Sequence, residues 1–223
     1  MGSLRAALSP RRPFTMKIKI CGITNSEDAD VAVKAGADVL GFVMYRKSPR
    51  WVEPAAAKTI VARLPPFVLA VGVFVNEEAD RVRALMDECG FALAQLHGDE
   101  TARYCQDLGR PVLKALRLKD RETILALREY QGRANMRGFL IDAFSDQAYG
   151  GTGRTVDWTL AQEAARSTPI ILAGGLTPAN VAEAISRVRP YGVDVSSGVE
   201  LSPGKKDPDK VKAFVEAARL VRG

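Results

Sequence analysis

Eight short apolar runs rich in β-forming residues recur along the chain, and helical periodicity follows each of them. The runs span residues 17–21, 38–44, 68–75, 92–97, 111–116, 138–142, 169–173 and 192–196. Several are apolar at consecutive positions, which is typical of parallel strands buried on both faces. Eight strand–helix units in 223 residues predict one α/β domain folded as a (β/α)8 TIM barrel. A doubly wound sheet gives a similar alternation, but no G-x-G-x-x-G motif follows the first run.

Several of the helical stretches begin with recognisable signals for a helix N-terminus. Thr24 and Glu27 have the spacing of a capping box. The pairs at 177–178 and 207–208, Thr-Pro and Asp-Pro, each place a capping side chain before a proline suited to the first helical position. Asn76 precedes two glutamates, whose charge favours a helix N-terminus. The sequence therefore predicts helices that start next to these residues.

The net charge of +6 is unevenly distributed along the chain. Residues 1–15 contain three arginines and no acidic residue, so half of the excess lies in this tail. The mildly basic remainder suits a small anionic ligand and argues against a nucleic-acid partner, which usually requires clustered Lys and Arg. Because the tail lacks periodicity, we expect a disordered extension at 1–15 and one barrel domain at 16–223. An Arg-rich transit peptide is the alternative for the tail.

The cysteines and the single histidine restrict the other classes of protein. Cys21, Cys89 and Cys105 show no metal-ligand spacing and no secretory signal accompanies them, which predicts reduced thiols in a cytoplasmic protein. One histidine, His97, argues against a histidine-based metal site. No apolar run approaches the roughly 20 residues that cross a bilayer, so we expect no membrane partner.

In a (β/α)8 barrel, the functional side chains lie at the carboxyl ends of the strands and in the loops that follow. Two of these loops, AGG at 173–175 and SSG at 196–198, are turns of small residues. Exposed backbone N–H groups and a following helix N-terminus would suit a phosphate there. The alternative is that Gly174, Gly175 and Gly198 only permit tight turns.

Two titratable residues end the strands on either side of the predicted phosphate loops. Strands close in chain order, so Asp142 on the sixth strand and Cys21 on the first would flank a ligand held at the seventh and eighth. A carboxyl and a thiol in those places suit acid–base catalysis. The alternatives are a loop-capping aspartate and a small hydrophobic thiol in the core. Arg50, in the loop after the second strand, could bind a carboxylate through its forked guanidinium.

The residues that carry these signals also match a known family. From Lys17 onward the chain resembles phosphoribosylanthranilate isomerase of tryptophan biosynthesis, and only residues 1–15 fall outside the resemblance. The matching blocks are KICGIT, GFVMYRKSPRWV, VGVFVN, QLHGDE, LIDAF, YGGTGRTVDW, LAGGLTPANV and DVSSGVELSPGKKD.

The resemblance implies a (β/α)8 barrel that converts the aminoaldose N-(5'-phosphoribosyl)anthranilate to an aminoketose phosphate by an Amadori rearrangement, without a metal or organic cofactor. It assigns the general base to Cys21, the general acid to Asp142 and the substrate carboxylate to Arg50. The remaining implied ligand-binding residues are Gly174, Gly175, Ser197 and Gly198 at the phosphate, with His97 and Asp194 lining the pocket or orienting neighbours. The partner is thus a small phosphosugar–anthranilate substrate, bound by a monomer or homodimer.

Three other functions remain open from the sequence. The barrel isomerase of histidine biosynthesis performs the same rearrangement, but with an aspartate expected as base in place of Cys21. A lyase barrel would use Lys114, at the end of the fifth strand, although an ion pair there is the simpler explanation. A barrel that only binds a phosphorylated ligand is the non-catalytic alternative. For catalysis at neutral pH, we expect the N-terminus of the first helix to lower the pKa of Cys21.

Overall fold

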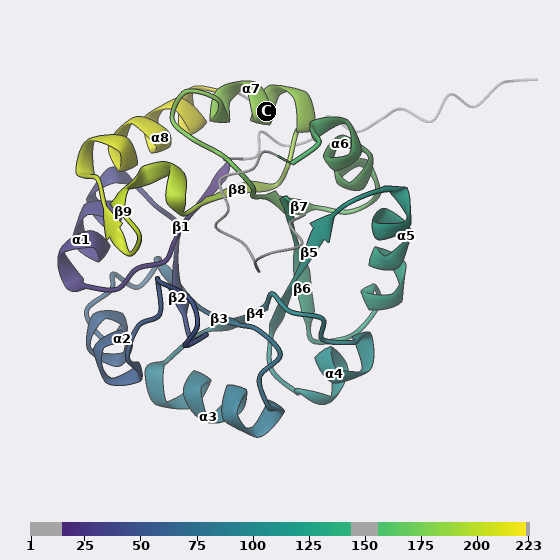
Figure 1. The fold of residues 1–223 in the computed structure, drawn as a ribbon, viewed down its shortest axis with the longest axis horizontal. Coiled ribbons are helices and arrows are strands. Elements are labelled where there is room, and N and C mark those ends of the chain that lie inside the picture. The colour runs from purple at the N-terminus through teal and green to yellow at the C-terminus, as the bar shows by residue number, and fades with distance from the viewer. Residues whose placement is uncertain (1–14, 144–155, 222–223) are drawn as a thin grey trace, which may run out of the picture.

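The computed structural model describes residues 15–143 and 156–221, in which eight parallel strands form a closed barrel (Figure 1). The predicted extension at 1–15 lies, apart from its last residue, outside the described residues, as does most of the YGGTGRTVDW block. The strands are β1 (Lys17–Cys21), β2 (Val39–Val43), β3 (Leu69–Phe74), β4 (Leu93–Leu96), β5 (Val112–Leu118), β6 (Met136–Ala143), β7 (Ile170–Leu172) and β8 (Gly192–Val195).

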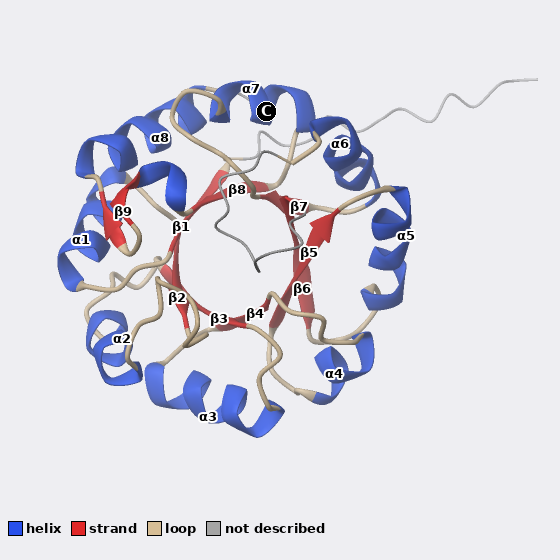
Figure 2. Ribbon diagram, in the orientation of Figure 1, coloured by secondary structure: helices blue, strands red, loops and turns tan. Residues whose placement is uncertain are grey.

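Helices alternate with the strands and form an outer ring around the barrel, as Figure 2 shows. They are α1 (Ser26–Ala35), α2 (Pro54–Val61), α3 (Ala79–Cys89), α4 (Ala102–Asp107), α5 (Arg121–Tyr130), α6 (Trp158–Ser167), α7 (Val181–Val188) and α8 (Pro208–Leu220). In the described part of the chain, no helix is both long and apolar enough to span a membrane.

The barrel closes through parallel pairing of the first strand with the last. β1 lies beside β8 in a register that sets Lys17 opposite Gly192 and Lys19 opposite Asp194. An open, doubly wound sheet would leave two strands at free edges, so this pairing confirms the predicted (β/α)8 barrel. The closure also brings the loops after β7 and β8 next to the end of β1.

Side chains alternate between the helix ring and the barrel interior along each strand. On β1, Ile18 and Ile20 are fully buried in the large apolar cluster between strands and helices. Lys19 and Cys21 occupy the other face and are also buried. The barrel interior toward the carboxyl ends of the strands therefore carries polar and titratable groups, while the apolar core lies mainly between the strands and the helices.

The expected helix starts are confirmed at one position and wrong at three others, one of which is Asn76. Asp207 caps α8, whose first residue is Pro208, as the Asp-Pro pair predicts. The start of α1 is shifted from the predicted capping box, because Asn25 caps the helix by accepting a hydrogen bond from the N–H of Asp28. The Thr-Pro pair at 177–178 lies in a turn ahead of α7, whose N-cap residue is Asn180.

Asn76 does not start a helix. Its backbone has a positive φ of 50° and its Oδ1 accepts a hydrogen bond from the N–H of Asp99, which ties the loop after β3 to the loop after β4. The chain after β8 also differs from the simple strand–helix pattern. A short 3₁₀ helix, η1 (Ser197–Val199), and a hairpin of β9 (Glu200–Ser202) and β10 (Lys205–Lys206) precede α8.

We predict that Asp207→Ala lowers the free energy of unfolding by about 1 kcal/mol, the typical effect of losing an N-cap. The Asp207 carboxylate accepts hydrogen bonds from the N–H groups of Asp209 and Lys210, which no other group in the helix can satisfy. Urea denaturation followed by circular dichroism measures the difference. The control is Glu216→Ala, an exposed position of the same helix. Equal stability of the two variants would contradict the capping role.

Candidate active site

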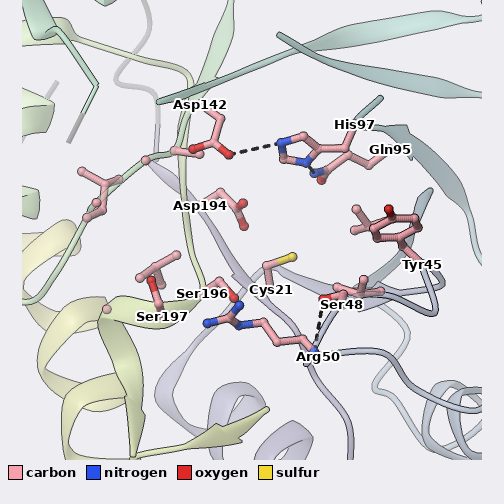
Figure 3. A pocket seen from close by; sticks show the side chains of 18 of the residues that line it. Cys21, Tyr45, Ser48, Arg50, Gln95, His97, Asp142, Asp194, Ser196 and Ser197 are labelled. Carbon is pink, nitrogen blue, oxygen red and sulfur yellow. Dashed lines mark hydrogen bonds and ion pairs between the residues drawn. The ribbon is translucent and has the colours of Figure 1, made fainter. Parts of the chain in front are cut away.

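A cleft opens at the carboxyl ends of the barrel strands (Figure 3). All nine site residues expected from the sequence line it: Cys21, Arg50, His97, Asp142, Gly174, Gly175, Asp194, Ser197 and Gly198. The cleft therefore brings together all the residues that the pattern and the resemblance assign to an isomerase site.

Cys21 is the last residue of β1, and its thiol is buried against an apolar wall. Val43 and Val73 form that wall with Tyr45 packed beside them. The neighbouring strand carries Gly41, where an added Cβ would lie 2.8 Å from the Cys21 Sγ and 3.0 Å from the Lys19 Nζ. A glycine at this position is thus required to leave room for the thiol and the ammonium group together.

The expectation that the N-terminus of the first helix lowers the pKa of Cys21 is wrong. Helix α1 begins five residues after Cys21, and burial is the largest influence, raising the pKa of the thiol above its ordinary value. The nearby Lys19 ammonium opposes this shift, while Asp194 adds to it. The electrostatic partner that favours the thiolate is therefore Lys19, a buried lysine on the same strand, which was not predicted as a site residue.

Lys19 and Asp194 form a buried ion pair across the closure of the barrel. Their side chains are 2% and 8% exposed, and Nζ lies 2.9 Å from Oδ1. Burial disfavours the charged ammonium, but Asp194 and Cys21 outweigh it, so the pKa of Lys19 lies above its ordinary value. A buried charge normally needs such a partner. Asp194 thus both lines the cleft and holds Lys19 beside the thiol.

Three side chains that line the cleft, those of Asp142, His97 and Gln95, are linked in a row by hydrogen bonds. The Asp142 Oδ1 accepts a hydrogen bond from the N–H of Ala143 at 2.8 Å. Its Oδ2 lies 3.1 Å from the Nε2 of His97, whose Nδ1 lies 2.9 Å from the Nε2 of Gln95. His97 therefore orients the Asp142 carboxyl, in agreement with the expectation that it lines the pocket or orients a neighbour.

The two glycine loops lie together at one end of the cleft. Gly174 has a positive φ of 83°, and a Cβ there would lie 2.6 Å from the N of Ala143 and 3.0 Å from the Asp142 Oδ1. This glycine lets the loop after β7 approach Asp142 closely. Ser197 and Gly198, in η1, line the cleft from the loop after β8.

Arg50 lines the cleft, but one edge of its guanidinium group is already hydrogen-bonded to Glu200. Nε and Nη2 bind both oxygens of Glu200 at 2.7–3.2 Å, so this edge of the guanidinium is not free for a ligand carboxylate. Glu200 also pairs with Lys206 at 2.9 Å. Burial opposes ionisation of Glu200, but the two cations outweigh it and lower the pKa of its carboxyl. Burial lowers the pKa of Lys206, against the opposing effect of Glu200.

The polar groups that support the ligand-facing residues were not predicted from the sequence. Lys19 and Gln95 interrupt apolar strand runs, and a charged or amide residue inside a buried strand is a signal that could have identified them. Lys206 donates to the backbone oxygens of Cys21 and Ser196 as well as to Glu200. No comparable signal marked Glu200 and Lys206, because they come from a hairpin that the pattern did not predict.

Lys114 does not reach the cleft. It lies in the middle of β5, which continues to Leu118, so the expectation that it ends the strand is wrong. Its Nζ is buried in a hydrogen-bonded ion pair with Glu100 at 2.8 Å and also donates to the Gly98 oxygen. Lys114 therefore cannot act as the nucleophile that the lyase alternative requires. Within residues 15–143 and 156–221, no cluster of three or more His, Cys, Asp or Glu side chains could hold a metal ion.

A closed parallel barrel whose cleft gathers buried titratable groups at the carboxyl ends of its strands defines a (β/α)8-barrel enzyme. The family model described as N-(5'phosphoribosyl)anthranilate (PRA) isomerase matches residues 18–217. The chain belongs to this family, and its expected resemblance is confirmed.

Individual relatives agree with this assignment. The N-(5'-phosphoribosyl)anthranilate isomerase of Citrifermentans bemidjiense is 52% identical over 205 residues, covering 92% of this chain and 98% of the relative. The crystal structure of phosphoribosyl anthranilate isomerase from Thermotoga maritima has a TM-score of 0.85 at 40% identity, covering 92% and 100% of the two chains. A further structure of such an isomerase, in complex with reduced 1-(o-carboxyphenylamino)-1-deoxyribulose 5-phosphate, has a TM-score of 0.82 at 39% identity, with the same coverage.

We predict that Glu200→Gln destabilises the protein by about 3 kcal/mol at pH 7, because it leaves two cations without their buried carboxylate. The Glu200 pKa is lowered on folding, so its contribution is fully present above its ordinary range and is lost as the pH falls through the lower, folded value. Urea denaturation at several pH values should show the difference between variant and wild type shrinking below about pH 4. A difference that does not depend on pH would contradict the ionic origin.

Proposed function

We propose that this chain catalyses the Amadori rearrangement of its family with Cys21 as general base and Asp142 as general acid. The reaction converts N-(5'-phosphoribosyl)anthranilate to 1-(2-carboxyphenylamino)-1-deoxyribulose 5-phosphate in tryptophan biosynthesis. One observation carries the assignment of roles: the thiol and the carboxyl lie on different strands and face one cleft (Figure 3). Glycines of the loops after β7 and β8 line the same cleft.

The substrate itself supplies the electron sink for this reaction. Asp142, protonated, gives its proton to the furanose ring oxygen, and the anthranilate nitrogen opens the ring to a protonated Schiff base. The adjacent C–H becomes acidic because its electrons can flow onto that nitrogen. Cys21 as thiolate removes this proton, and the resulting enolamine tautomerises to the ketone. Each step thus needs a proton donor or acceptor on the protein and no redox group.

Lys19 supports the thiolate during this step. Burial raises the pKa of Cys21, and a buried ammonium group beside it is the main opposing influence. The ion pair with Asp194 fixes Lys19 in place, so the ammonium need not reorganise when the thiol ionises. Cys21 thereby exchanges its proton with the substrate carbon while the surrounding charges stay fixed.

The substrate carboxylate is bound by Arg50 in a different way from that expected. Glu200 occupies the Nε and Nη2 edge, which holds the guanidinium rigid and leaves the Nη1 end for the ligand. At the other end, Gly174, Gly175, Ser197 and Gly198 receive the phosphate. Ser196 supports this placement, because the residue lines the cleft and its buried Oγ has no hydrogen-bond partner in the described part of the chain.

The protein acts as a monomer or a homodimer on this small-molecule substrate, in the cytoplasm and without a nucleic-acid partner. The mild basicity of the chain outside residues 1–15 supports a small anionic ligand. Turnover of synthetic N-(5'-phosphoribosyl)anthranilate by the purified chain, and growth of a tryptophan auxotroph lacking this isomerase, test the activity. No turnover by the folded wild-type protein would refute it.

We predict that Cys21→Ser and Asp142→Asn each lower kcat by at least about 100-fold, the usual contribution of a general acid or base. Equilibrium binding of the product analogue should change little, because neither residue is the main anchor of the ligand. Steady-state kinetics and calorimetric titration measure the two effects.

The matched control for the thiol is Cys89→Ser. Cys89 is buried outside the cleft and donates to the Pro54 oxygen, which a serine hydroxyl can also do. This variant should keep its kcat. Near-normal turnover of Cys21→Ser or of Asp142→Asn would remove that residue from the mechanism.

We predict that Arg50→Lys raises KM about 10- to 100-fold, because a charge-assisted hydrogen bond to the substrate carboxylate is weakened. The comparison substrate carries aniline in place of anthranilate and therefore has no carboxylate. Its KM should be the same for Arg50→Lys and wild type. The control variant is Arg46→Lys, at an exposed position over the Trp51 ring. Equal losses for both substrates would show that Arg50 acts only through Glu200.

A further inference from the structure

A buried amide oxygen without a partner lies next to the proposed general acid. Gln95, on β4, is fully buried, and its Oε1 has no hydrogen-bond partner among the described residues. Leaving such an oxygen unpaired costs about 1–3 kcal/mol. The amide Nε2 is used, since it lies 2.9 Å from the Nδ1 of His97. Rotating the carboxamide by half a turn exchanges the two atoms and presents Oε1 to the ring instead.

The two amide orientations require different proton positions on His97. With Nε2 of Gln95 facing the ring, the amide donates and Nδ1 must be unprotonated. The single proton of the neutral ring then lies on Nε2 and is donated to Asp142 Oδ2, 3.1 Å away. With Oε1 facing the ring, Nδ1 must carry a proton. A second proton can then lie between His97 Nε2 and Asp142 Oδ2. It makes either Asp142 a carboxylic acid or His97 an imidazolium.

We propose that Gln95 is a positioning residue whose amide turns with the protonation of the His97–Asp142 pair. The amide donates when the pair holds one proton and accepts when the pair holds two. This inference rests on the proposed role of Asp142 as general acid, because an aspartate is ordinarily ionised at neutral pH and must hold a proton before ring opening. Gln95 thus stabilises the doubly protonated pair that precedes proton transfer and the singly protonated pair that follows it.

The charged groups that the described residues place on neighbouring strands are already matched by opposite charges or hydrogen bonds. On the β1 and β8 side, Lys19 is paired with Asp194, and Cys21 lies beside them. On the β5 side, Lys114 is paired with Glu100 and donates to the backbone oxygens that flank His97 in sequence. The Gln95 amide is therefore the group in contact with Nδ1 that can respond to a change in the proton count of the pair.

The chain contains one histidine, so the imidazole signals of ¹⁵N-labelled, tag-free protein belong to His97 without further assignment. The test records the Nδ1 and Nε2 shifts between pH 5 and pH 9, together with the pH profile of kcat. In the wild type, we expect the Nε2–H tautomer at high pH and a protonated Nδ1 once the pair takes up its second proton.

Two substitutions of Gln95 should move the basic limb of the kcat profile in opposite directions. Gln95→Glu can only accept, so it keeps Nδ1 protonated and should shift the limb to higher pH by about one unit or more, a tenfold change in proton affinity. Gln95→Met can neither accept nor donate, and the doubly protonated pair loses more from this change, because a hydrogen bond from a charged imidazolium N–H is stronger than one to a neutral ring nitrogen. The limb should therefore shift to lower pH, and kcat at neutral pH should fall, while KM stays within about twofold of wild type.

Gln162→Met, at a half-buried position of α6 outside the cleft, is the control and should leave both readouts unchanged. A merely structural role of Gln95 would lower activity in both Gln95 variants without opposite shifts. Unchanged imidazole signals in Gln95→Met, or shifts of the two limbs in the same direction, would overturn the proposal. The imidazole signals do not depend on turnover, so they remain decisive if wild-type protein fails to isomerise the substrate, a result that would instead refute the proposed function.

Discussion

The pairing of β1 with β8 is the constraint on which the rest of this structure depends. It closes the sheet, and its register sets Lys19 directly opposite Asp194. The ion pair between them could not form in an open sheet, where β1 and β8 would lie apart. The same closure carries Cys21 to the rim beside the loops that follow β7 and β8. Fold and site are therefore consequences of one register.

Several charged side chains in and around the cleft are buried from water, and each forms an ion pair with a side chain of opposite charge. Lys19 is matched by Asp194, and Glu200 is shared between Arg50 and Lys206. Buried pairs of this kind add little to stability compared with apolar packing. Their value here is rigidity, because fixed dipoles and charges can stabilise a changing charge on the substrate without reorganising.

Much of this arrangement could be predicted from the sequence, because strand ends are visible as the points where apolar runs stop. Cys21, Asp142 and the glycines of the two loops occupy such points, and barrel geometry then brings them together. The exact first residues of the helices were less predictable. Asn25 and Thr24 are both good helix caps, but the Thr24 hydroxyl donates to the Gly204 oxygen in the β9–β10 hairpin, and Asn25 caps α1.

The groups that the sequence did not reveal are those whose role depends on contacts across the barrel. Nothing local in the sequence distinguishes Glu200 from an exposed acid, yet it binds Arg50 across 150 residues of chain. Likewise, the pKa of Cys21 is set by burial and by Lys19 rather than by the nearest helix. Long-range pairing of this kind follows from the folded register and not from spacing along the chain.

The central claim is spatial: one bound phosphosugar places its reacting carbons between the Cys21 sulfur and the Asp142 carboxyl. A crystal structure of this chain with reduced 1-(o-carboxyphenylamino)-1-deoxyribulose 5-phosphate tests it most directly. We expect the phosphate at the loops after β7 and β8, with both side chains within roughly 3–3.5 Å of the atoms between which protons move. A ligand bound with its phosphate elsewhere, or with either side chain turned away from those atoms, would contradict the account.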